Sequence, residues 1–488
     1  AGVNAGNSIA SGGNYNVVVG DEAGTAITTG DHNVALGYAA LTAEDAHGYN
    51  TAIGGRSLAT LNAGADGYNT AVGYDSGRAM TTGIQNTLIG GLAGDAITTG
   101  SYNSVVGVNA GGAITTGAQN VAVGQGALAT NTTGATNTAL GDSSLSANTT
   151  ASYNTAVGAS ALVANTTGAK NTAVGYLALT TATTASFNTA VGAYAADALS
   201  TGTNNTAVGL QALSTATTSD NNTAVGFQSL LVNTTGASNV AVGAGALDAN
   251  TTANHNVGIG AVALGVNTTG TQNVAVGSLT LDANTTADNN TGLGYAALGA
   301  NTTGTANTAS GMNSMNINTT GDYNVAMGAG SLQQNTTADY NTAVGYSALL
   351  ANTTGAGNVA VGALALDANT TASNNTGLGY AALTANTTGT SNVAVGTNAL
   401  DANTTASNNT AVGHYSLLVN TTGAYNVAVG ALALDANTTA NANTALGNET
   451  LSANTTGTAN TAVGASALGV NTTASNNTAV GYSALIAN

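Results

Sequence analysis

The 488-residue chain contains no cysteine, no proline and no tryptophan, and it has only three basic residues against 20 acidic ones. The absence of cysteine excludes a disulfide framework and a thiolate metal site. Binding to nucleic acid needs a basic surface that displaces counterions, and three basic residues cannot supply one. No apolar run approaches the roughly 18 residues that a membrane-spanning helix needs. We therefore expect no nucleic-acid partner and no membrane insertion.

Residues that carry catalysis or cofactor binding are equally sparse. The four histidines, His32, His47, His255 and His414, are scattered, without carboxylate or cysteine partners at the spacing of metal ligands. No Gly-x-Ser-x-Gly motif stands where a strand would lead into a helix. We expect no catalytic residue, no cofactor and no metal site, and hence no enzyme.

What the chain does have is a repeat built on the block Asn-Thr-Ala-Val-Gly, found in pure form at Asn154–Gly158. Its Asn recurs every 17 residues over positions 69–477 and over positions 16–50, with one two-residue insertion between these stretches. The result is 28 copies, and each keeps the Asn and the Gly four residues later. Units of a stacked array bury surface only against their neighbours. We predict that residues 1–15 lead into a single continuous array over residues 16–488.

The composition of the repeat predicts its fold. With the Asn as position 0, position 1 is Thr or Val, position 2 usually Ala, position 3 usually Val, Leu or Ile, and position 8 usually Leu. Short segments rich in β-branched residues and bounded by Gly and Asn favour strands. A Gly in every copy would cost a helix about 1 kcal/mol each. We predict an all-β parallel β-solenoid, a two-strand β-roll with strands at positions 0–3 and 6–10, of about 28 rungs with 17 residues per rung.

The Asn at position 0 predicts a structural ladder of stacked amides, because a polar ligand site would not require the residue in every copy. Representative members of this ladder are Asn137, Asn154, Asn171, Asn188, Asn205 and Asn222. The Gly at position 4 indicates a positive φ or a close backbone neighbour. Representative turn glycines are Gly141, Gly158, Gly175 and Gly192.

Position 11 carries Asn in eighteen Asn-Thr-Thr triplets, and each triplet matches the N-glycosylation acceptor pattern. Candidate acceptors are Asn131, Asn148, Asn165, Asn233, Asn250 and Asn267. Other copies place Ile27, Ile97 or Leu199 at this position, which indicates a buried side chain. We favour a second, inward-facing Asn ladder, with a column of glycans as the alternative.

Successive side chains of a strand point to opposite faces, so positions 1 and 3 oppose position 2. Both faces are then apolar, and strands of this kind are usually covered on both sides. One side is the core of the solenoid. We expect the other to contact a second copy of the chain, and so predict a homo-oligomer.

Asp at position 9 alternates between copies in the second half of the chain, as at Asp248 and Asp282. Stacked like charges destabilise a sheet, so we interpret this 34-residue period as a dilution of charge. Tyrosines gather just before the Asn and just after the Gly of the repeat. They brace the turns or, as the alternative, form a stripe that stacks on glycans, with Tyr176, Tyr295, Tyr346 and Tyr380 as candidates.

The unit Asn-Thr-Ala-Val-Gly-Tyr-x-Ala-Leu-x-x-Asn-Thr-Thr-Gly, as at Asn341–Gly355, resembles repeats of bacterial and phage tail-fibre-type proteins. It is more distantly similar to the head repeats of trimeric autotransporter adhesins. The resemblance covers nearly the whole chain from Asn16. It implies a β-roll, commonly trimeric, in an extracellular fibre used for attachment, located outside the cell or on a cell or virion surface.

These observations favour a structural protein that forms the shaft of an extracellular fibre, assembled as a homotrimer or as a head-to-tail filament. The repeats run to Asn488, so we expect further domains or another subunit to cover that end. One alternative is an adhesin head or tail fibre that binds cell-surface glycans. A minor alternative is an ice-binding β-solenoid that uses its columns of Thr.

Overall fold

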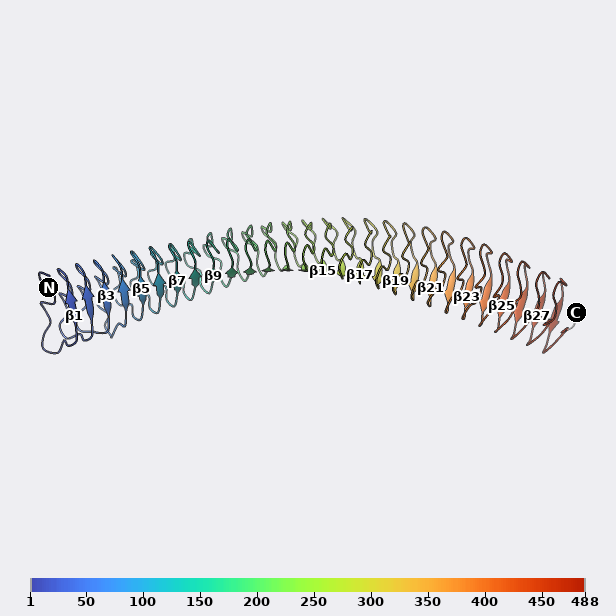
Figure 1. The fold of residues 1–488 in the computed structure, drawn as a ribbon, viewed down its shortest axis with the longest axis horizontal. Helices are drawn as coiled ribbons and strands as arrows, with labels where there is room; N and C mark the ends of the chain where they lie inside the picture. The colour runs from blue at the N-terminus through green and yellow to red at the C-terminus, as the bar shows by residue number, and fades with distance from the viewer. Residues whose placement is uncertain (1, 487–488) are drawn as a thin grey trace. The chain divides into compact units, whose positions relative to one another are not determined.

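A computed structural model of the protein describes residues 2–486. Residue 1 of the predicted leading segment and residues 487–488 of the predicted array lie outside the described residues. The fold is an all-β parallel β-solenoid, and no helix occurs in the described range. The chain divides into two compact units, Ala1–Ala244 and Gly245–Asn488. Each unit is a stack of rungs with one strand per rung (Figure 1).

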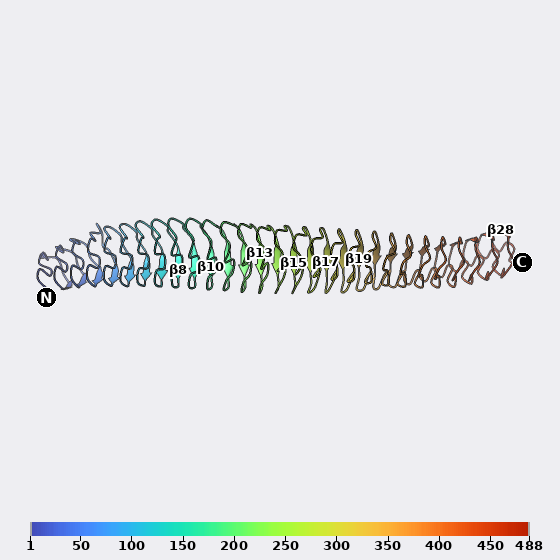
Figure 2. The ribbon, with the colours of Figure 1, turned by 90° about the horizontal axis from the view of Figure 1, so that it is seen from above.

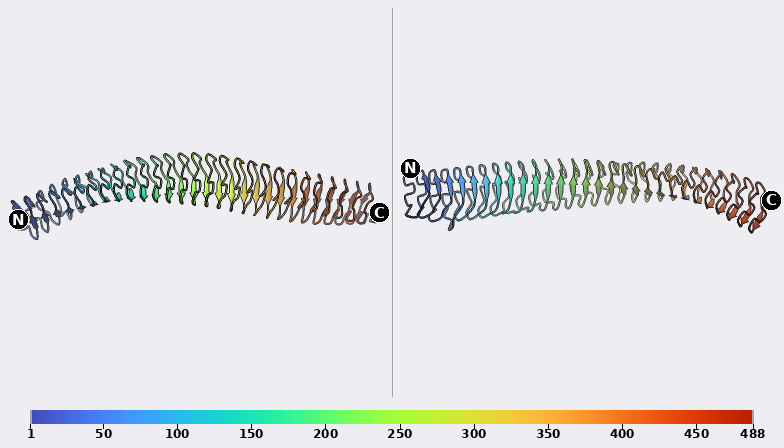
Figure 3. Two further views of the ribbon diagram at one scale, coloured as in Figure 1. Left: turned by 45° about the horizontal axis from the view of Figure 1, so that its top comes forward. Right: turned by 60° about the horizontal axis from the view of Figure 1, so that its bottom comes forward.

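The strands of each unit lie side by side on one side of its stack, and turns form the other sides (Figure 2 and Figure 3). The first unit holds β1(Val17–Val19), β2(Val34–Leu36), β3(Thr51–Ile53), β4(Thr70–Val72), β5(Thr87–Ile89), β6(Ser104–Val106), β7(Val121–Val123), β8(Thr138–Leu140), β9(Thr155–Val157), β10(Thr172–Val174), β11(Thr189–Val191), β12(Thr206–Val208), β13(Thr223–Val225) and β14(Val240–Val242). The second unit holds β15(Val257–Ile259), β16(Val274–Val276), β17(Thr291–Leu293), β18(Thr308–Ser310), β19(Val325–Met327), β20(Thr342–Val344), β21(Val359–Val361), β22(Thr376–Leu378), β23(Val393–Val395), β24(Thr410–Val412), β25(Val427–Val429), β26(Thr444–Leu446), β27(Thr461–Val463) and β28(Thr478–Val480).

The register of the sheet follows the repeat. Thr155 of β9 pairs with Thr172 of β10, and the same offset of 17 residues recurs along each unit. The exception is β3 with β4, where Thr51 pairs with Thr70 because the turn between them holds the two inserted residues. The predicted parallel solenoid of 17-residue rungs, about 28 in number, is confirmed.

The core is thin because the inward side chains are small. From β2 to β28 the central residue of each strand is buried, as Ala156 is, whereas its two neighbours face outward and stay partly exposed. The Leu at position 8 is also buried, as at Leu162. Small Ala side chains let the opposite walls of a rung approach closely, and Leu fills the remaining space.

The predicted second strand at positions 6–10 is wrong, because this segment is a turn. Positions 6 and 8 adopt positive φ, as in Ser160 with φ 55° and Leu162 with φ 52°. A left-handed conformation at alternate residues prevents the extended pleat of a strand. The backbone still bonds between rungs: Ser160 N–H donates to Asp142 O at 2.9 Å, and Leu162 N–H donates to Ala178 O at 3.0 Å. These bonds offset a conformational cost of about 1–2 kcal/mol per residue.

The glycine at position 4 ends each strand. Gly141, Gly158, Gly175 and Gly192 have φ of 138°, 127°, 142° and 135°. A Cβ atom on Gly158 would lie 2.5 Å from the carbonyl oxygen of Gly175 in the next rung. Both the backbone conformation and the stacking therefore require glycine at this position.

From residue 134 onward the corner at positions 14 and 15 alternates between two forms with one interruption, and it has the same 34-residue period as the Asp at position 9. One form carries Gly followed by Ala or Thr, and the backbone N–H of its position 15 donates to a side chain in the next rung. Ala169 N–H donates to Ser186 Oγ at 3.1 Å, and Thr203 N–H donates to Asp220 Oδ1 at 2.6 Å. The other form supplies that Ser or Asp. The alternation of the corner therefore has a hydrogen-bonding cause, which is separate from the dilution of charge proposed for position 9.

Candidate functional site

The Asn ladder predicted at position 0 is present. The N–H of Asn154 donates to Oδ1 of Asn137 at 2.9 Å, and Nδ2 of Asn154 donates to Gly168 O at 2.8 Å. Several rungs add a bond between amides, such as Asn222 Nδ2 to Asn205 Oδ1 at 3.2 Å. All six representative residues are at most 2% exposed. The ladder stabilises the stack because the Nδ2 of each of these amides donates within its own rung, while its Oδ1 accepts from the N–H of the next Asn along the chain.

Position 11 forms a second ladder of amides. Asn148 Nδ2 donates to Asn131 Oδ1 at 2.8 Å and to Ala151 O at 3.0 Å. The six candidate acceptors of glycosylation, Asn131, Asn148, Asn165, Asn233, Asn250 and Asn267, are all fully buried. An oligosaccharide must be attached to Nδ2 and project into solvent. The folded chain instead holds these nitrogens inside as hydrogen-bond donors, which favours the ladder over the column of glycans.

The outward face of the strands is uncharged, with Thr, Ser or Val at position 1 and an aliphatic residue at position 3 in nearly every copy. Positions 1 and 3 of all 28 copies contain no charged residue. Their side chains are half-buried or exposed, including Val121, Leu140 and Met327. We call the surface formed by positions 1 and 3 the strand face. It holds a row of partly exposed aliphatic side chains at position 3 along each unit, and a continuous row of this kind is typical of an interaction surface.

The structure does not bring the four candidate glycan-stacking tyrosines together. Tyr176, Tyr295, Tyr346 and Tyr380 are about half exposed, at 51–64%. No two of them occupy adjacent rungs, because even the last two are 34 residues apart. The one ring contact in this group is an edge contact between Tyr176 and Tyr194, with centroids 5.5 Å apart, among the described residues.

Stacked aromatic rings occur instead just before the Asn of the first rungs. Tyr15, His32, Tyr49 and Tyr68 stack in that order, with ring centroids 4.8, 5.1 and 4.8 Å apart. The two inner rings, His32 and Tyr49, contact a neighbouring ring on each of their faces. A sugar stacks on the face of a ring, so this stack presents mainly edges and braces the corner of the solenoid.

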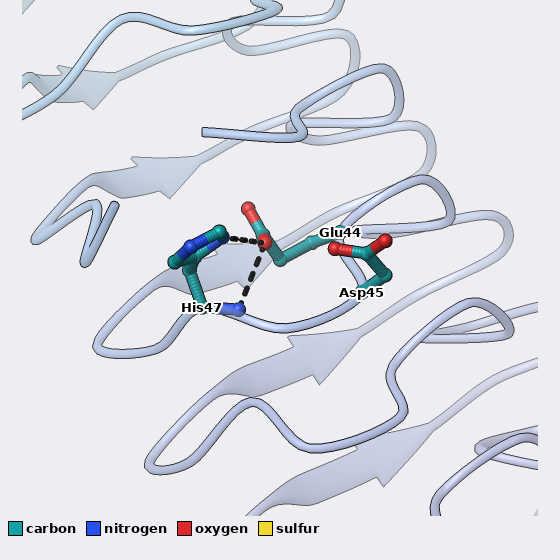
Figure 4. A group of neighbouring side chains, drawn as sticks. All are labelled: Glu44, Asp45 and His47. Atoms are coloured by element: carbon teal, nitrogen blue, oxygen red, sulfur yellow. Dashed lines mark hydrogen bonds and ion pairs between the residues drawn. The ribbon is translucent and has the colours of Figure 1, made fainter. Parts of the chain in front are cut away.

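One group of polar side chains departs from the repeat. Glu44, Asp45 and His47, which we call the polar cluster, lie in the turn between β2 and β3 (Figure 4). Glu44 occupies position 11, where the adjacent rungs place Ile27 and Leu61, and it is fully buried. The sequence-based expectation that no histidine has a carboxylate partner is wrong for His47, whose Nδ1 lies 3.5 Å from Glu44 Oε1. The tight turn brings residues i and i+3 together.

Backbone groups hold the Glu44 carboxylate in place. The N–H of His47 donates to Oε1 at 3.2 Å, and the N–H of Ala63 donates to Oε2 at 3.2 Å. Burial raises the pKa of the Glu44 carboxyl, and these two hydrogen bonds oppose the rise. Ala63 belongs to the lengthened turn between β3 and β4. A Glu in the buried column next to the only insertion was the sequence signal that could have revealed this site.

The basic residues are engaged with neighbouring side chains. Arg56 pairs with Asp75 and lies over the ring of Tyr74, with its Cζ 5.0 Å from the centroid. Arg78 approaches Asp75 at 3.6 Å, and a similar contact with Asp95 is 3.9 Å long. Lys170, the third basic residue of the chain, lies over a phenylalanine ring at 5.1 Å. Charge pairing is thus concentrated in the first rungs.

Within residues 2–486, the polar cluster is the only group of three ligand-type side chains close enough together to hold a metal ion. The same range contains no helix that is both long and apolar enough to cross a bilayer. A scan against protein-family models gave no match, and no curated protein matches the chain. The chain is a long parallel β-solenoid repeat protein.

Proposed function

We propose that the protein is structural and forms the shaft of an extracellular fibre, in which copies of the chain associate side by side through the strand face. The observation that carries this proposal is the absence of charge from positions 1 and 3 in all 28 copies of a chain with a net charge of −17. Acidic residues occur at other positions of the repeat, such as 9 and 15. A surface kept free of charge along the whole repeat suits burial against a partner.

The area of the strand face is sufficient for a stable interface. Each rung exposes part of two side chains, an aliphatic one at position 3 in nearly every copy and most often Thr at position 1. At roughly 40 Å² each they leave roughly 80 Å² per rung in solvent. The 14 strands of one unit then offer roughly 1,100 Å². A standard interface buries about 800 Å² per partner. The regular 17-residue register also repeats the contact identically from rung to rung, as a shaft requires.

Three charges placed on the strand face test the proposal. We expect the unmodified protein to sediment as an oligomer, and the triple variant Val157→Glu, Val174→Glu and Val191→Glu to dissociate at the same concentration. The matched control introduces Glu at Thr150, Thr167 and Thr184, which are exposed at a corner of nearby rungs. A monomeric unmodified protein, or a face variant with unchanged mass, would contradict side-by-side association. Circular dichroism checks that both variants fold.

The two alternative functions have less support from the geometry. Glycan binding through tyrosines lacks a continuous platform, as described above. Ice binding was expected to use the Thr pairs of the Asn-Thr-Thr triplets. The first Thr of each pair instead bonds within the stack, as Thr149 Oγ1 does when it donates to Thr166 O at 3.1 Å. Only the second Thr of each triplet from Asn131 to Asn454 remains exposed, so the exposed Thr side chains form one row along a corner.

A further inference from the structure

Glu44 of the polar cluster interrupts a column of buried apolar side chains. Position 11 holds an aliphatic or Met side chain in the other rungs near it, namely Ile27, Leu61 and Met80, all of them fully buried. A carboxylate in the same place is desolvated, which is costly unless hydrogen bonds or a cation compensate it. Glu44 receives two backbone hydrogen bonds, and the lengthened turn contributes one of them. The local fold is therefore built around this carboxylate.

His47 provides a second, independent observation. Its Nδ1 atom is buried and faces Glu44, yet within the described residues it makes no hydrogen bond. The rest of the ring is partly open to solvent, with the side chain 29% exposed. A buried ring nitrogen that faces a carboxylate oxygen 3.5 Å away, with no hydrogen bond between them, is placed as a metal ligand would be. Asp45 adds a third group, and one ligand atom from each residue lies within 4.8 Å of the others (Figure 4).

We propose that Glu44, Asp45 and His47 bind a divalent transition-metal ion of the Zn²⁺ type. One imidazole nitrogen with two carboxylates suits such ions, whereas Ca²⁺ and Mg²⁺ favour oxygen ligands alone. Two ligands about 2.1 Å from an ion at a tetrahedral angle lie about 3.4 Å apart. The 3.5 Å between His47 Nδ1 and Glu44 Oε1 matches that spacing.

The surroundings of the cluster fit the roles of the three ligands. The backbone donors of His47 and Ala63 fix the Glu44 carboxylate, as outer hydrogen bonds orient ligands in metal sites. Asp45 lies at the partly exposed rim, so its side chain can rotate toward the ion. The open side of His47 leaves room for water to complete the coordination. The three ligands all belong to the turn after β2, and the hydrogen bond from Ala63 to Glu44 connects that turn to the lengthened turn after β3.

Titration of the full-length protein with Co²⁺, followed by displacement with Zn²⁺, tests the site. We expect one Co²⁺ per chain, with a visible absorption spectrum typical of a site that includes nitrogen, and loss of that spectrum when Zn²⁺ is added. His47→Gln and Glu44→Gln should each weaken Co²⁺ binding at least about 100-fold, beyond the 10- to 100-fold that loss of an outer hydrogen bond costs. The control His255→Gln removes an exposed histidine and should leave the affinity unchanged.

Two further measurements test the metal site even if Glu44→Gln or His47→Gln folds poorly. Asp45→Asn changes only the rim of the cluster and should weaken binding without altering the circular dichroism spectrum. Zn²⁺ should raise the thermal midpoint of the unmodified protein and leave that of His47→Gln unchanged. An unmodified protein without a Co²⁺ spectrum, or an affinity that survives His47→Gln, would overturn the proposal. These readouts do not depend on whether the chain forms fibres.

Discussion

The early rungs, residues 16–119, and the second unit use the same backbone coil but fill position 11 in different ways. In the early rungs this column is mostly aliphatic, as at Ile97 and Ile114. In the second unit it is Asn at every described copy from Asn250 to Asn471. Apart from β3 with β4, neighbouring strands pair with the same offset of 17 residues in both regions. Backbone hydrogen bonds between rungs thus define the coil. The side chains at position 11 can be aliphatic or Asn, provided that neighbouring rungs carry the same kind.

The largest effect should come from mixing the two kinds of column. Ile97→Asn would bury an amide oxygen between Met80 and Ile114, neither of which can donate to it. Asn148→Ile would leave Asn131 Oδ1 without the donor that it now has at 2.8 Å. Each change should lower the free energy of unfolding by about 2–4 kcal/mol.

Urea denaturation followed by circular dichroism measures these losses. The matched control is Ile97→Val, which keeps the early column apolar and should cost only about 1 kcal/mol. If Ile97→Asn cost no more than Ile97→Val, buried columns would not need to match along the stack.

A smaller effect should appear in the pH dependence. Burial raises the pKa of the Asp367 and Asp435 carboxyls, and the nearby charges of Asp401 and Glu449 respectively raise them further. The second unit has no Lys or Arg to offset this. The folded state therefore retains protons that the unfolded chain has released, so stability from these groups falls as the pH rises from about 4 through their folded pKa.

We expect the thermal midpoint of the double variant Asp367→Asn and Asp435→Asn to fall less between pH 4 and pH 7 than that of the unmodified protein. Asp142→Asn, at an exposed position in the first unit, serves as the control and should leave the slope unchanged. A double variant with the slope of the unmodified protein would show that these carboxyls do not contribute.

The smallest expected effect is a gain. The position-11 ladder of the first unit breaks after Asn165, because the next rung has Ala182. Asn165 Oδ1 is buried and has no hydrogen-bond partner among residues 2–486. The triple variant Ala182→Asn, Leu199→Asn and Ala216→Asn would place an Nδ2 donor beneath that oxygen and continue the ladder to Asn233, so that no new amide oxygen is buried against an aliphatic side chain. It should raise the free energy of unfolding by about 1 kcal/mol in the same urea assay. Ala182→Leu, which cannot donate, should give no such gain.

The sequence predicted the features that depend on periodicity. The 17-residue repeat led to the parallel register, the number of rungs and the inward Asn columns, because a side chain in a stacked array meets its own copy in the next rung. The second strand was predicted wrongly, since Leu162 and its equivalents adopt a left-handed conformation that few non-glycine residues take up.

The polar cluster was missed for a different reason. Glu44 and His47 are only three residues apart, and their approach depends on a tight turn within a single rung rather than on the repeat. The contribution of Ala63 depends on an insertion whose conformation the other copies do not reveal. Periodicity describes what the rungs share and says little about the one rung that differs.

The alternating corners of the second unit favour changes of length by two rungs at a time. A duplication or deletion of 34 residues would leave each Gly corner next to a rung that offers Ser, Asn or Asp. A duplication or deletion of 17 residues would instead leave one backbone N–H at position 15 without its side-chain acceptor. The second unit contains one place where the alternation is interrupted, because two rungs with Gly corners, at Gly304 and Gly321, follow each other. There Asp322 accepts the N–H of Thr305 at 2.6 Å, while its own N–H donates to Asp339 at 2.7 Å. A single aspartate that serves both roles is thus enough to let the length of the protein change by an odd number of rungs.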